Sequence, residues 1–318
     1  MEDKGDIENV LDFAVSSIFE IAEDKMKKSI VHLKHIIDKN YDDIEKWQMD
    51  KSLTSGVTTG FKKLDSLTLG FQNSDLIIIA ARPSMGKTAF ALNIARNAAV
   101  KKNIPVAIFS LEMSEKQLGL RMLCAEAGIN SYRVKHGFLN HDNLDKLTKA
   151  AGILSEAPIY IDDTPDNSAM DIRAKARRLR MDSGIGLILI DYLQLLKVRR
   201  YSDRRDLEIA DISKSLKALA KELDIPVVAL SQLNRKLEER KDRRPKLSDL
   251  RESGALEQDA DLVIFIYRDE VYNQHEGNPN KGIAEILLSK HRNGQTGIAR
   301  LAFLSEYTRF DNLANEYA

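Results

Sequence analysis

The stretch of sequence that decides the fold reads Leu76-Ile-Ile-Ile-Ala-Ala-Arg-Pro-Ser-Met-Gly-Lys-Thr88. Its first five residues are continuously apolar, which predicts a buried strand over Leu76–Ala80. The residues that follow Thr88 have a helical pattern. A strand, a short loop ending in Gly-Lys-Thr and a helix make up the P-loop pattern, in which successive backbone N–H groups and the helix dipole surround a phosphate.

Each residue type in this loop has an expected task. Gly86 lets the backbone approach a phosphate closely, Lys87 reaches the β- and γ-phosphates, and the Thr88 hydroxyl can ligate Mg²⁺. Ala81 replaces the first glycine of the general pattern, so an ordinary strand-to-helix turn is the alternative interpretation. We expect a nucleotide to contact Arg82, Pro83, Ser84, Met85, Gly86, Lys87, Thr88 and Ala89.

Two carboxylates follow other predicted strands and complete this candidate site. Asp191 ends the apolar run Leu187–Ile190, at the sheet edge where ligands bind, and there it would hold Mg²⁺ through the metal's water shell. Glu112 follows the run Val106–Phe109 at the same edge and is the candidate base that orients and deprotonates a water. The alternative for Glu112 is a helix N-terminal residue near Ser110 that stabilises the helix dipole.

Short apolar runs alternate with helical stretches along the rest of the chain. Besides those already named, the runs are Ile159–Ile161, Val227–Leu230 and Leu262–Ile266, and the helical stretches include Ala89–Val100, Glu115–Ala127 and Leu207–Leu223. This alternation predicts the α/β class, with a mostly parallel central sheet flanked by helices on both faces. Ile283–Ser289 and Ile298–Phe303, joined through Asn293-Gly294, predict a closing antiparallel hairpin.

The first 50 residues differ from the rest in charge and pattern. They carry seven Lys and Arg against thirteen Asp and Glu, and apolar residues at three- and four-residue steps predict an amphipathic linker helix over about 6–24. A weaker helical pattern covers 29–50, and Leu53–Gly60 has the composition of a turn-rich linker. We divide the chain into a helical linker segment, 1–52, and an α/β domain, 53–318. The amphipathic helix needs a partner surface, either on its own domain or on another copy.

Overall composition indicates a large soluble domain with no evident membrane segment. The 318 residues are 43% apolar and 30% charged, with 48 basic and 48 acidic side chains. No apolar run approaches the roughly 18 residues of a membrane helix. The single cysteine, Cys124, excludes an internal disulfide and is compatible with a reducing cytosol. The zero net charge argues against binding nucleic acid through bulk positive charge.

Two short segments depart from this neutrality. Lys197–Arg205 has five basic residues and one acidic residue, and Arg235–Lys246 has seven basic and three acidic residues. Both follow predicted strands and have loop-like composition. They are candidates for contact with a phosphate backbone, and solvated charged loops are the alternative.

Six motifs in order carry a resemblance to a known family. They are Arg82-Pro-Ser-Met-Gly-Lys-Thr88, Ser110-Leu-Glu-Met-Ser114, Asp191-Tyr-Leu-Gln-Leu195, Ser231-Gln-Leu-Asn-Arg235, Leu250-Arg-Glu-Ser-Gly254 and Lys290-His-Arg-Asn-Gly294. Together they closely resemble the C-terminal motor domain of DnaB-family replicative DNA helicases, over essentially the whole chain. The acidic N-terminal helix resembles the linker helix of that family, and Ala81 in the P-loop is similar to what the family shows.

The resemblance implies a RecA-like ATPase that assembles as a hexameric ring around single-stranded DNA. It implies ATP and Mg²⁺ between subunits and translocation in the 5′→3′ direction that unwinds fork DNA. It assigns Glu112 as catalytic base, Gln232 as sensor of the γ-phosphate, and Lys290 and Arg292 as residues that reach the neighbouring subunit's site. An exposed basic hairpin tip is the alternative for Lys290 and Arg292.

The resemblance also assigns contacts with DNA and with other proteins. It matches Arg251, Glu252 and Gly254 to residues that contact the phosphate backbone, and the two basic segments to loops facing the channel. It implies a helicase loader and a primase as partners and a cytoplasmic replisome as location, bacterial or phage-encoded. The family's globular N-terminal collar domain has no counterpart in the roughly fifty residues before the motor, and Asn273–Asn280 is expected to be a surface loop without chemistry.

Two other classes of protein share parts of this pattern. A RecA-like recombinase that forms filaments would have the same sheet, P-loop and Glu112. A nucleotide-gated scaffold that binds a loader or primase would need no catalytic residues. The motifs at Lys290–Gly294 and Arg251–Gly254 favour the helicase over the recombinase, and Lys87, Glu112 and Asp191 together favour an enzyme over the scaffold.

Overall fold

The computed structural model describes residues 30–49, 55–196 and 205–313. The chain separates into two compact units, Met1–Leu53 and Thr54–Ala318. In the first unit, the weak helical pattern over 29–50 is confirmed as helix α2, Leu33–Met49. The linker helix predicted over 6–24 lies outside the described residues.

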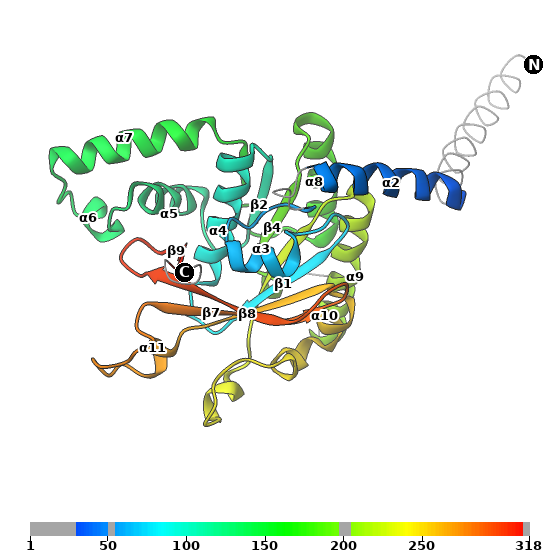
Figure 1. Cartoon of the computed structure of the whole chain (residues 1–318). Helices are drawn as coiled ribbons and strands as arrows, with labels where there is room; N and C mark the ends of the chain where they lie inside the picture. Colours follow the sequence, from blue (N-terminus) through cyan, green and yellow to red (C-terminus); the bar gives the residue numbers. More distant parts are fainter. Residues whose placement is uncertain (1–29, 50–54, 197–204, 314–318) are drawn as a thin grey trace, which may run out of the picture. The chain divides into compact units, whose positions relative to one another are not determined.

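The second unit is built around one mixed β-sheet (Figure 1). Within the described residues it has nine strands in the order β3-β2-β4-β5-β1-β6-β7-β8-β9. The strands are β1 (Leu76–Ala81), β2 (Val106–Ser110), β3 (Ile159–Asp162), β4 (Leu187–Asp191), β5 (Val227–Gln232), β6 (Leu262–Tyr267), β7 (Ile283–His291), β8 (Gly297–Leu304) and β9 (Arg309–Asn312). Strands β1 to β6 pair in parallel, and β7, β8 and β9 add antiparallel. The predicted parallel sheet and closing hairpin are both confirmed.

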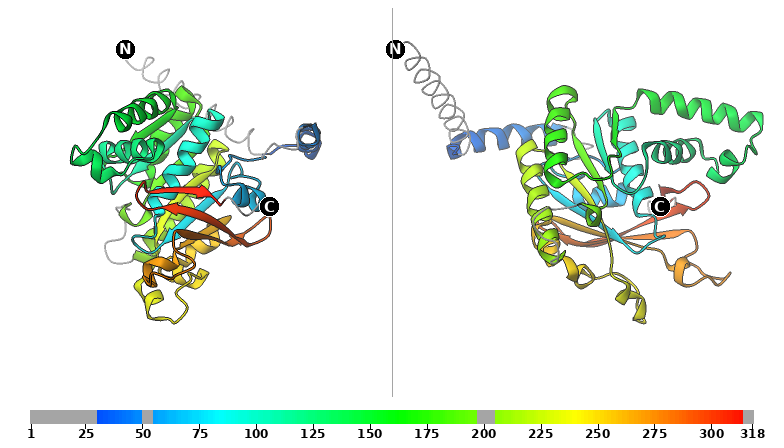
Figure 2. Two further views of the ribbon diagram at one scale, coloured as in Figure 1. Left: turned by 60° about the vertical axis from the view of Figure 1, so that its left-hand side comes forward. Right: turned by 180° about the vertical axis from the view of Figure 1, so that it is seen from behind.

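Helices lie on both sides of this sheet (Figure 2). They are α3 (Lys62–Thr68), α4 (Lys87–Arg96), α5 (Glu115–Ala127), α6 (Ser131–Lys135), α7 (His141–Glu156), α8 (Ala169–Ser183), α9 (Arg205–Leu223), α10 (Gly254–Asp259) and α11 (Asp269–Tyr272). A π-helical turn, η1 (Asn97–Lys101), extends α4, and the short 3₁₀ segments are η2 (Leu193–Leu195), η3 (Arg235–Glu239) and η4 (Leu247–Ser253).

The side chains of β1 alternate between two separate apolar cores. Ile77 and Ile79 pack with side chains of α3, α4 and α5, whereas Leu76 and Ile78 pack with side chains of α8, α9 and α10. All six residues of β1 are buried. A strand covered on both faces needs an apolar side chain at every position, which explains the continuous apolar run in the sequence.

The stretch Leu53–Gly60 was predicted as a linker, and this interpretation is wrong for its second half. Val57 forms an isolated antiparallel bridge with Phe71, and both Val57 and Thr59 are buried. The Asp65 carboxylate, on α3, accepts hydrogen bonds from Thr58 Oγ1 at 2.6 Å, from Thr59 N at 2.8 Å and from Thr59 Oγ1 at 2.7 Å. These bonds fold the turn onto the domain, because they satisfy polar groups that would otherwise be buried without partners.

Strand β9 was absent from the sequence prediction. It pairs with β8 and carries Phe310, whose ring lies 4.7 Å from Phe303 and 5.2 Å from Phe90, measured between centroids. Its sequence, Arg-Phe-Asp-Asn, contains one apolar residue and gives no periodic signal. The strand forms because Phe310 fills the aromatic cluster beneath the P-loop helix α4.

We expect Asp65→Ala to lower the free energy of unfolding by about 2–4 kcal/mol, because it leaves the buried Thr59 hydroxyl and N–H without an acceptor. Urea unfolding measures this change. The neighbouring exposed Ser66→Ala on the same helix serves as control and should change stability by less than about 0.5 kcal/mol. Equal losses for the two variants would contradict the assigned role of Asp65.

Candidate functional site

The P-loop joins the carboxyl end of β1 to the first turn of α4. Ser84 and Gly86 both have left-handed backbone conformations, with φ of +67° and +94°, and they turn the chain between strand and helix. A Cβ atom at Gly86 would lie 3.0 Å from the Phe310 ring and 3.3 Å from the Phe303 ring. Glycine is therefore required at this position both for its backbone angle and for the packing beneath it.

A cavity of about 720 Å³ opens over the P-loop. Pro83, Ser84, Gly86, Lys87 and Thr88 line it together with Arg82 and Ala89. Met85 does not line it, because its side chain is buried in the apolar core. Lys116, Arg121 and Lys135 from the α5–α6 region lie on the wall of the same cavity, which suits it to a polyanion.

Two side chains that line this cavity, Lys87 and Thr88, lie next to the buried carboxylate of Asp191. Thr88 Oγ1 donates a hydrogen bond to Asp191 Oδ2 at 2.7 Å, and Lys87 Nζ lies 3.8 Å from Asp191 Oδ1. Lys87 Nζ also lies 4.4 Å from the centroid of the Tyr192 ring. Burial lowers the pKa of Lys87, and the negative charges of Asp191 and Glu112 oppose that shift.

The same residues fit a magnesium ion. Asp191 is buried, and its Oδ1 atom has no hydrogen-bond partner among the described residues. Thr88 supplies a hydroxyl next to it, and Mg²⁺ prefers oxygen ligands. No cluster of three or more His, Cys, Asp or Glu side chains in the described part of the chain could hold a metal alone. In nucleotide sites, Mg²⁺ is bound by one or two side chains together with phosphates.

Glu112 and Gln232 reach the cavity from two neighbouring strand ends. Glu112 follows β2, is exposed, and lines the cavity with Lys87. The N-terminus of α5 is capped by Ser114 and Gln117, so capping that helix does not require Glu112. Gln232 ends β5 beside Ala81, in the register of β1.

Gln194, which the sequence analysis did not single out, holds the end of β5. Its Nε2 atom donates to Ser231 Oγ at 2.9 Å and to the Gln232 carbonyl at 3.2 Å, and its Oε1 atom accepts from Gln232 N at 3.3 Å. The only signal for this residue is its place in the Asp191-Tyr-Leu-Gln-Leu195 motif, three positions after the strand that ends in Asp191.

Arg82 was predicted to contact the nucleotide, and its side chain binds the protein. Its Nε atom donates to Glu238 Oε1 at 2.8 Å, and its Nη1 atom donates to the Leu233 carbonyl at 2.8 Å. Arg82 is buried, and Glu238 belongs to η3 in the basic segment Arg235–Lys246. The P-loop is thus joined directly to that segment.

Arg268 supports the P-loop from β6, a role missed in the sequence. Its Nη1 atom donates to the Ser84 carbonyl at 3.0 Å, its guanidinium pairs with Glu270, and it lies 3.8 Å from the Phe303 ring centroid. The available signal was its position just after the apolar run Leu262–Ile266, at the same sheet edge as the P-loop.

Lys290 and Arg292 lie where the parallel strands begin, and the P-loop lies at the other end, where these strands finish. His291, between them, pairs with Leu262, the first residue of β6, whereas the P-loop follows the last residue of the parallel strand β1. In Figure 1, α10 and α11 mark these two ends, since one precedes β6 and the other follows it. Neither residue can therefore act on a phosphate at its own chain's P-loop.

The predicted DNA contacts are only partly described. The backbone of Arg251 and Glu252 lies in η4, and their side chains are outside the described residues. Gly254 begins α10, is exposed, and has open space where a Cβ would lie. Of the first basic segment, 197–204 lies outside the described residues.

The second basic segment uses part of its charge within the fold. Arg240 pairs with Asp249 at 2.6 Å, and Arg244 pairs with Glu285 at 2.7 Å. Arg235, Lys236 and Lys241 are exposed, among others. A count of charges along Arg235–Lys246 therefore overstates the charge that is available to a ligand.

Comparison with known proteins gives the family. Residues 56–312 match the family model of the DnaB-like helicase C-terminal domain. The chain belongs to this family. It is 52% identical over 313 residues to the replicative DNA helicase DnaB of Geobacillus stearothermophilus and 50% identical over 313 residues to the replicative DNA helicase DnaC of Bacillus subtilis (strain 168). Each alignment covers 98% of this chain and 68% of the relative.

Solved structures give the same result for this DnaB-like domain. One of them, an ATPase domain, has a TM-score of 0.84 and 41% identity, covering 90% of this chain and all of that one. A DnaB-like replicative helicase, described with its interactions with primase, has a TM-score of 0.82 and 40% identity, covering 96% and 73%. The chain is an ATP-hydrolysing motor of a replicative DNA helicase with the predicted RecA-like fold, and the recombinase alternative is not favoured.

Cys124 and the loop Asn273–Asn280 do not line the P-loop cavity. Cys124 is buried in α5, and burial raises the pKa of its thiol. The loop Asn273–Asn280 is largely exposed and is anchored by Asn278, whose Nδ2 atom donates to Asp269 and to the Asn273 carbonyl. No helix in the described residues has the length and hydropathy needed to cross a membrane.

We expect Lys87→Ala to lower ATP turnover at least about 100-fold, because its half-buried ammonium group lines the cavity within the P-loop, next to Asp191. A coupled assay of phosphate release measures the change, and thermal unfolding checks the fold. Lys221→Ala, an exposed lysine on α9, is the control and should keep its turnover. Turnover retained in the folded Lys87→Ala variant would show that the site is assigned wrongly.

Proposed function

We propose that this helicase motor hydrolyses ATP in composite sites between subunits of a hexameric ring, and so translocates 5′→3′ on single-stranded DNA and unwinds the fork. One observation carries the proposal. The P-loop and Arg292 lie at opposite ends of the parallel strands of one sheet, which supports a site that is completed by the arginine of a second copy. The direction and the number of subunits in this proposal are those that the resemblance to the DnaB family implies.

Within each site, the P-loop binds the phosphates of ATP. The N–H groups around Gly86 and the first turn of α4 face the cavity, and Lys87 neutralises the β- and γ-phosphates. Thr88 and Asp191 would hold Mg²⁺, which would supply positive charge against the charge that develops on the phosphates. Glu112 orients a water and accepts its proton, and Gln232, at the end of β5, contacts the γ-phosphate.

Arg292 completes the site of the neighbouring subunit, with Lys290 beside it. A guanidinium placed on the transferring phosphoryl group stabilises the charge of the transition state, and in related phosphoryl-transfer systems this is worth roughly 10³–10⁵ in rate. Supply of this group by another chain makes hydrolysis conditional on assembly.

DNA follows a path lined by the segment 197–205, the segment Arg235–Lys246 and the loop Arg251–Gly254. Backbone N–H groups near Gly254 are donors suited to phosphate oxygens, and Glu252 contributes through its main chain rather than through its charge. Arg82 links the P-loop to Glu238 in the second of these segments, and this ion pair is a direct contact between the nucleotide site and the proposed DNA path. Sequence-independent contact with phosphates suits a motor that moves along any sequence.

The remaining partners follow from the same assignment. The linker segment 1–52 packs on a neighbouring subunit of the ring, and a primase and a helicase loader bind the assembled ring in a cytoplasmic replisome. The described interactions of a structural relative with primase support the first of these two partners.

We expect subunits carrying Arg292→Ala and subunits carrying Glu112→Ala to keep only a small residual turnover separately and to be partly active when mixed. At equal mixing, about one quarter of the interfaces combine an intact P-loop side with an intact arginine side. ATP turnover against mixing ratio measures this, with light scattering to show assembly. An absence of rescue at every ratio, in assembled mixtures, would refute the trans arrangement.

We expect binding to single-stranded DNA to weaken steeply with salt, with a logarithmic slope of about −0.7 for each phosphate contacted. Fluorescence anisotropy at several salt concentrations measures the slope. Lys236→Ala with Lys241→Ala should make the slope shallower, because both lysines are exposed in the second basic segment. The matched pair Lys62→Ala with Lys63→Ala, exposed on α3, should leave it unchanged, and equal slopes for all variants would exclude the segment from the DNA path.

A further inference from the structure

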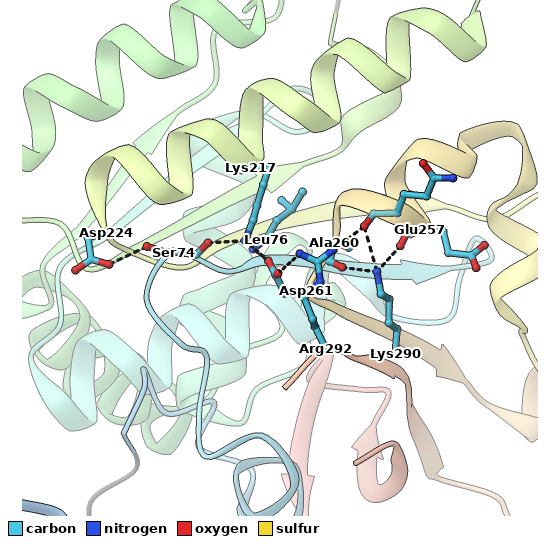
Figure 3. Close-up of polar contacts among 10 residues, drawn as sticks. Ser74, Leu76, Lys217, Asp224, Glu257, Ala260, Asp261, Lys290 and Arg292 are labelled. Carbon is cyan, nitrogen blue, oxygen red and sulfur yellow. Dashed lines mark hydrogen bonds and ion pairs between the residues drawn. The ribbon is translucent and has the colours of Figure 1, made fainter. Parts of the chain in front are cut away.

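A buried carboxylate lies directly beside Arg292. Asp261 connects the end of α10 to the start of β6, and its side chain is 4% exposed (Figure 3). It lies at the edge of the sheet opposite the P-loop. The nucleotide site does not use it, and a buried charge of this kind is costly unless it is paired.

Asp261 joins three elements of the domain. Its Oδ2 atom accepts hydrogen bonds from the Leu76 N–H, at the start of β1, at 2.9 Å and from Lys217 Nζ on α9. Its Oδ1 atom accepts from Arg292 Nη1 at 3.1 Å. The backbones are also paired, because Arg292 N donates to the Asp261 carbonyl at 2.9 Å. The Leu76 N–H and Lys217 therefore fix the carboxylate independently of its contact with the arginine.

The same geometry leaves Arg292 able to bind a ligand. Its side chain is 49% exposed, and its contacts within the described residues use Nη1 on Asp261 and Nη2 on the Gln258 carbonyl at 3.0 Å. A guanidinium has five N–H groups, so donors remain on its exposed side.

Lys290 differs from Arg292 in this respect. Its ammonium group donates to the carbonyls of Glu257 at 2.6 Å, Gln258 at 3.3 Å and Ala260 at 2.7 Å, which accounts for its three N–H groups. These carbonyls lie in the last turn of α10 and just beyond it, where acceptors lack partners within the helix. Lys290 thus joins α10 to β7, and α10 begins at Gly254 in the predicted DNA loop.

We propose that Asp261 is a positioning residue that holds the Arg292 guanidinium in the orientation in which it meets the nucleotide of the neighbouring subunit. Lys217 and the Leu76 N–H occupy Oδ2 and so direct Oδ1 to the arginine. This inference rests on the proposed trans action of Arg292. An arginine that is already ordered loses less side-chain entropy when the phosphate arrives, so its contact with the transition state is stronger.

The test is Asp261→Asn in the full-length chain, assembled with ATP and single-stranded DNA. The substitution keeps the shape of the side chain and removes its charge. We expect kcat for ATP to fall about 10- to 100-fold with little change in KM, because a misplaced group costs rate rather than substrate binding. An unchanged kcat would overturn the proposal.

Asp75→Asn is the matched control. Asp75 is a buried carboxylate in the same charge cluster, where burial and the charge of Asp261 raise its pKa to about 6, and it forms no described hydrogen bond with Arg292. Removal of its charge should leave kcat within about twofold of the unsubstituted protein, as for substitutions outside the site. An equal fall for Asp75→Asn and Asp261→Asn would attribute the effect to the cluster's overall charge and overturn the proposal.

Two further measurements distinguish the loss of Arg292 positioning in Asp261→Asn from a structural effect of the same substitution on β1. In an Arg292→Ala background, Asp261→Asn should cost no further activity, since it acts only through the arginine. Mixing Asp261→Asn subunits with Glu112→Ala subunits should restore turnover, because the second kind supplies an intact arginine to the intact P-loop of the first. A further loss in the double variant, or no rescue, would mean that Asp261 supports its own P-loop and would overturn the proposal.

The mixture of Arg292→Ala and Glu112→Ala subunits distinguishes failure of the trans arrangement from failure of the positioning role. Rescue there, together with no rescue for Asp261→Asn, refutes the positioning role and leaves the trans arrangement intact. No rescue in either mixture refutes the trans arrangement, and the positioning role with it. Where Asp261→Asn does not fold, Asp261→Glu keeps the charge and moves the carboxylate outward, and the same mixtures with that variant give the same two outcomes.

Discussion

The pairing of β1 with β5 on one side and with β6 on the other is the constraint on which both ends of the domain depend. At its carboxyl end, β1 leads into the P-loop, which lines a cavity together with Glu112 and Gln232 and binds the buried Asp191 through Thr88. At its amino end, the Leu76 N–H binds Asp261. Because β1 is paired on both sides, its register is fixed. The phosphate site at one end of the strand and the arginine site at the other are therefore held at a constant separation.

The central fold was predictable because its signals are local. Buried parallel strands require continuous apolar runs. The sequence Gly86-Lys87-Thr88 between a strand and a helix is a specific signal of a P-loop. Strand β9 was not predictable, since a single phenylalanine, Phe310, forms it through contacts with distant rings. In the site, the positions of Asp191 and Glu112 followed from strand ends, whereas the Arg82–Glu238 and Lys217–Asp261 pairs join residues far apart in sequence and have no local signature.

The zero net charge at first argued against a nucleic-acid partner, and the distribution of charge changes that interpretation. The acidic excess belongs to the first 50 residues, and positive charge gathers in two short segments. The structure refines the second of these, because Arg240 and Arg244 are paired with Asp249 and Glu285. These two ion pairs hold the loop to the rest of the domain. The exposed lysines beside them carry the charges whose attraction to phosphate would be screened by salt.

In the proposed arrangement, in which Arg292 acts at the P-loop of the neighbouring subunit, activity depends on the size of the assembly. Contacts of this kind are heterologous, since each subunit presents two different surfaces to its two neighbours. An open row then has one complete site fewer than it has subunits, and closure of the ring supplies the last one. In the proposed ring, a break at one interface that admits a DNA strand without a free end would end hydrolysis at that interface alone, and the remaining sites would stay competent.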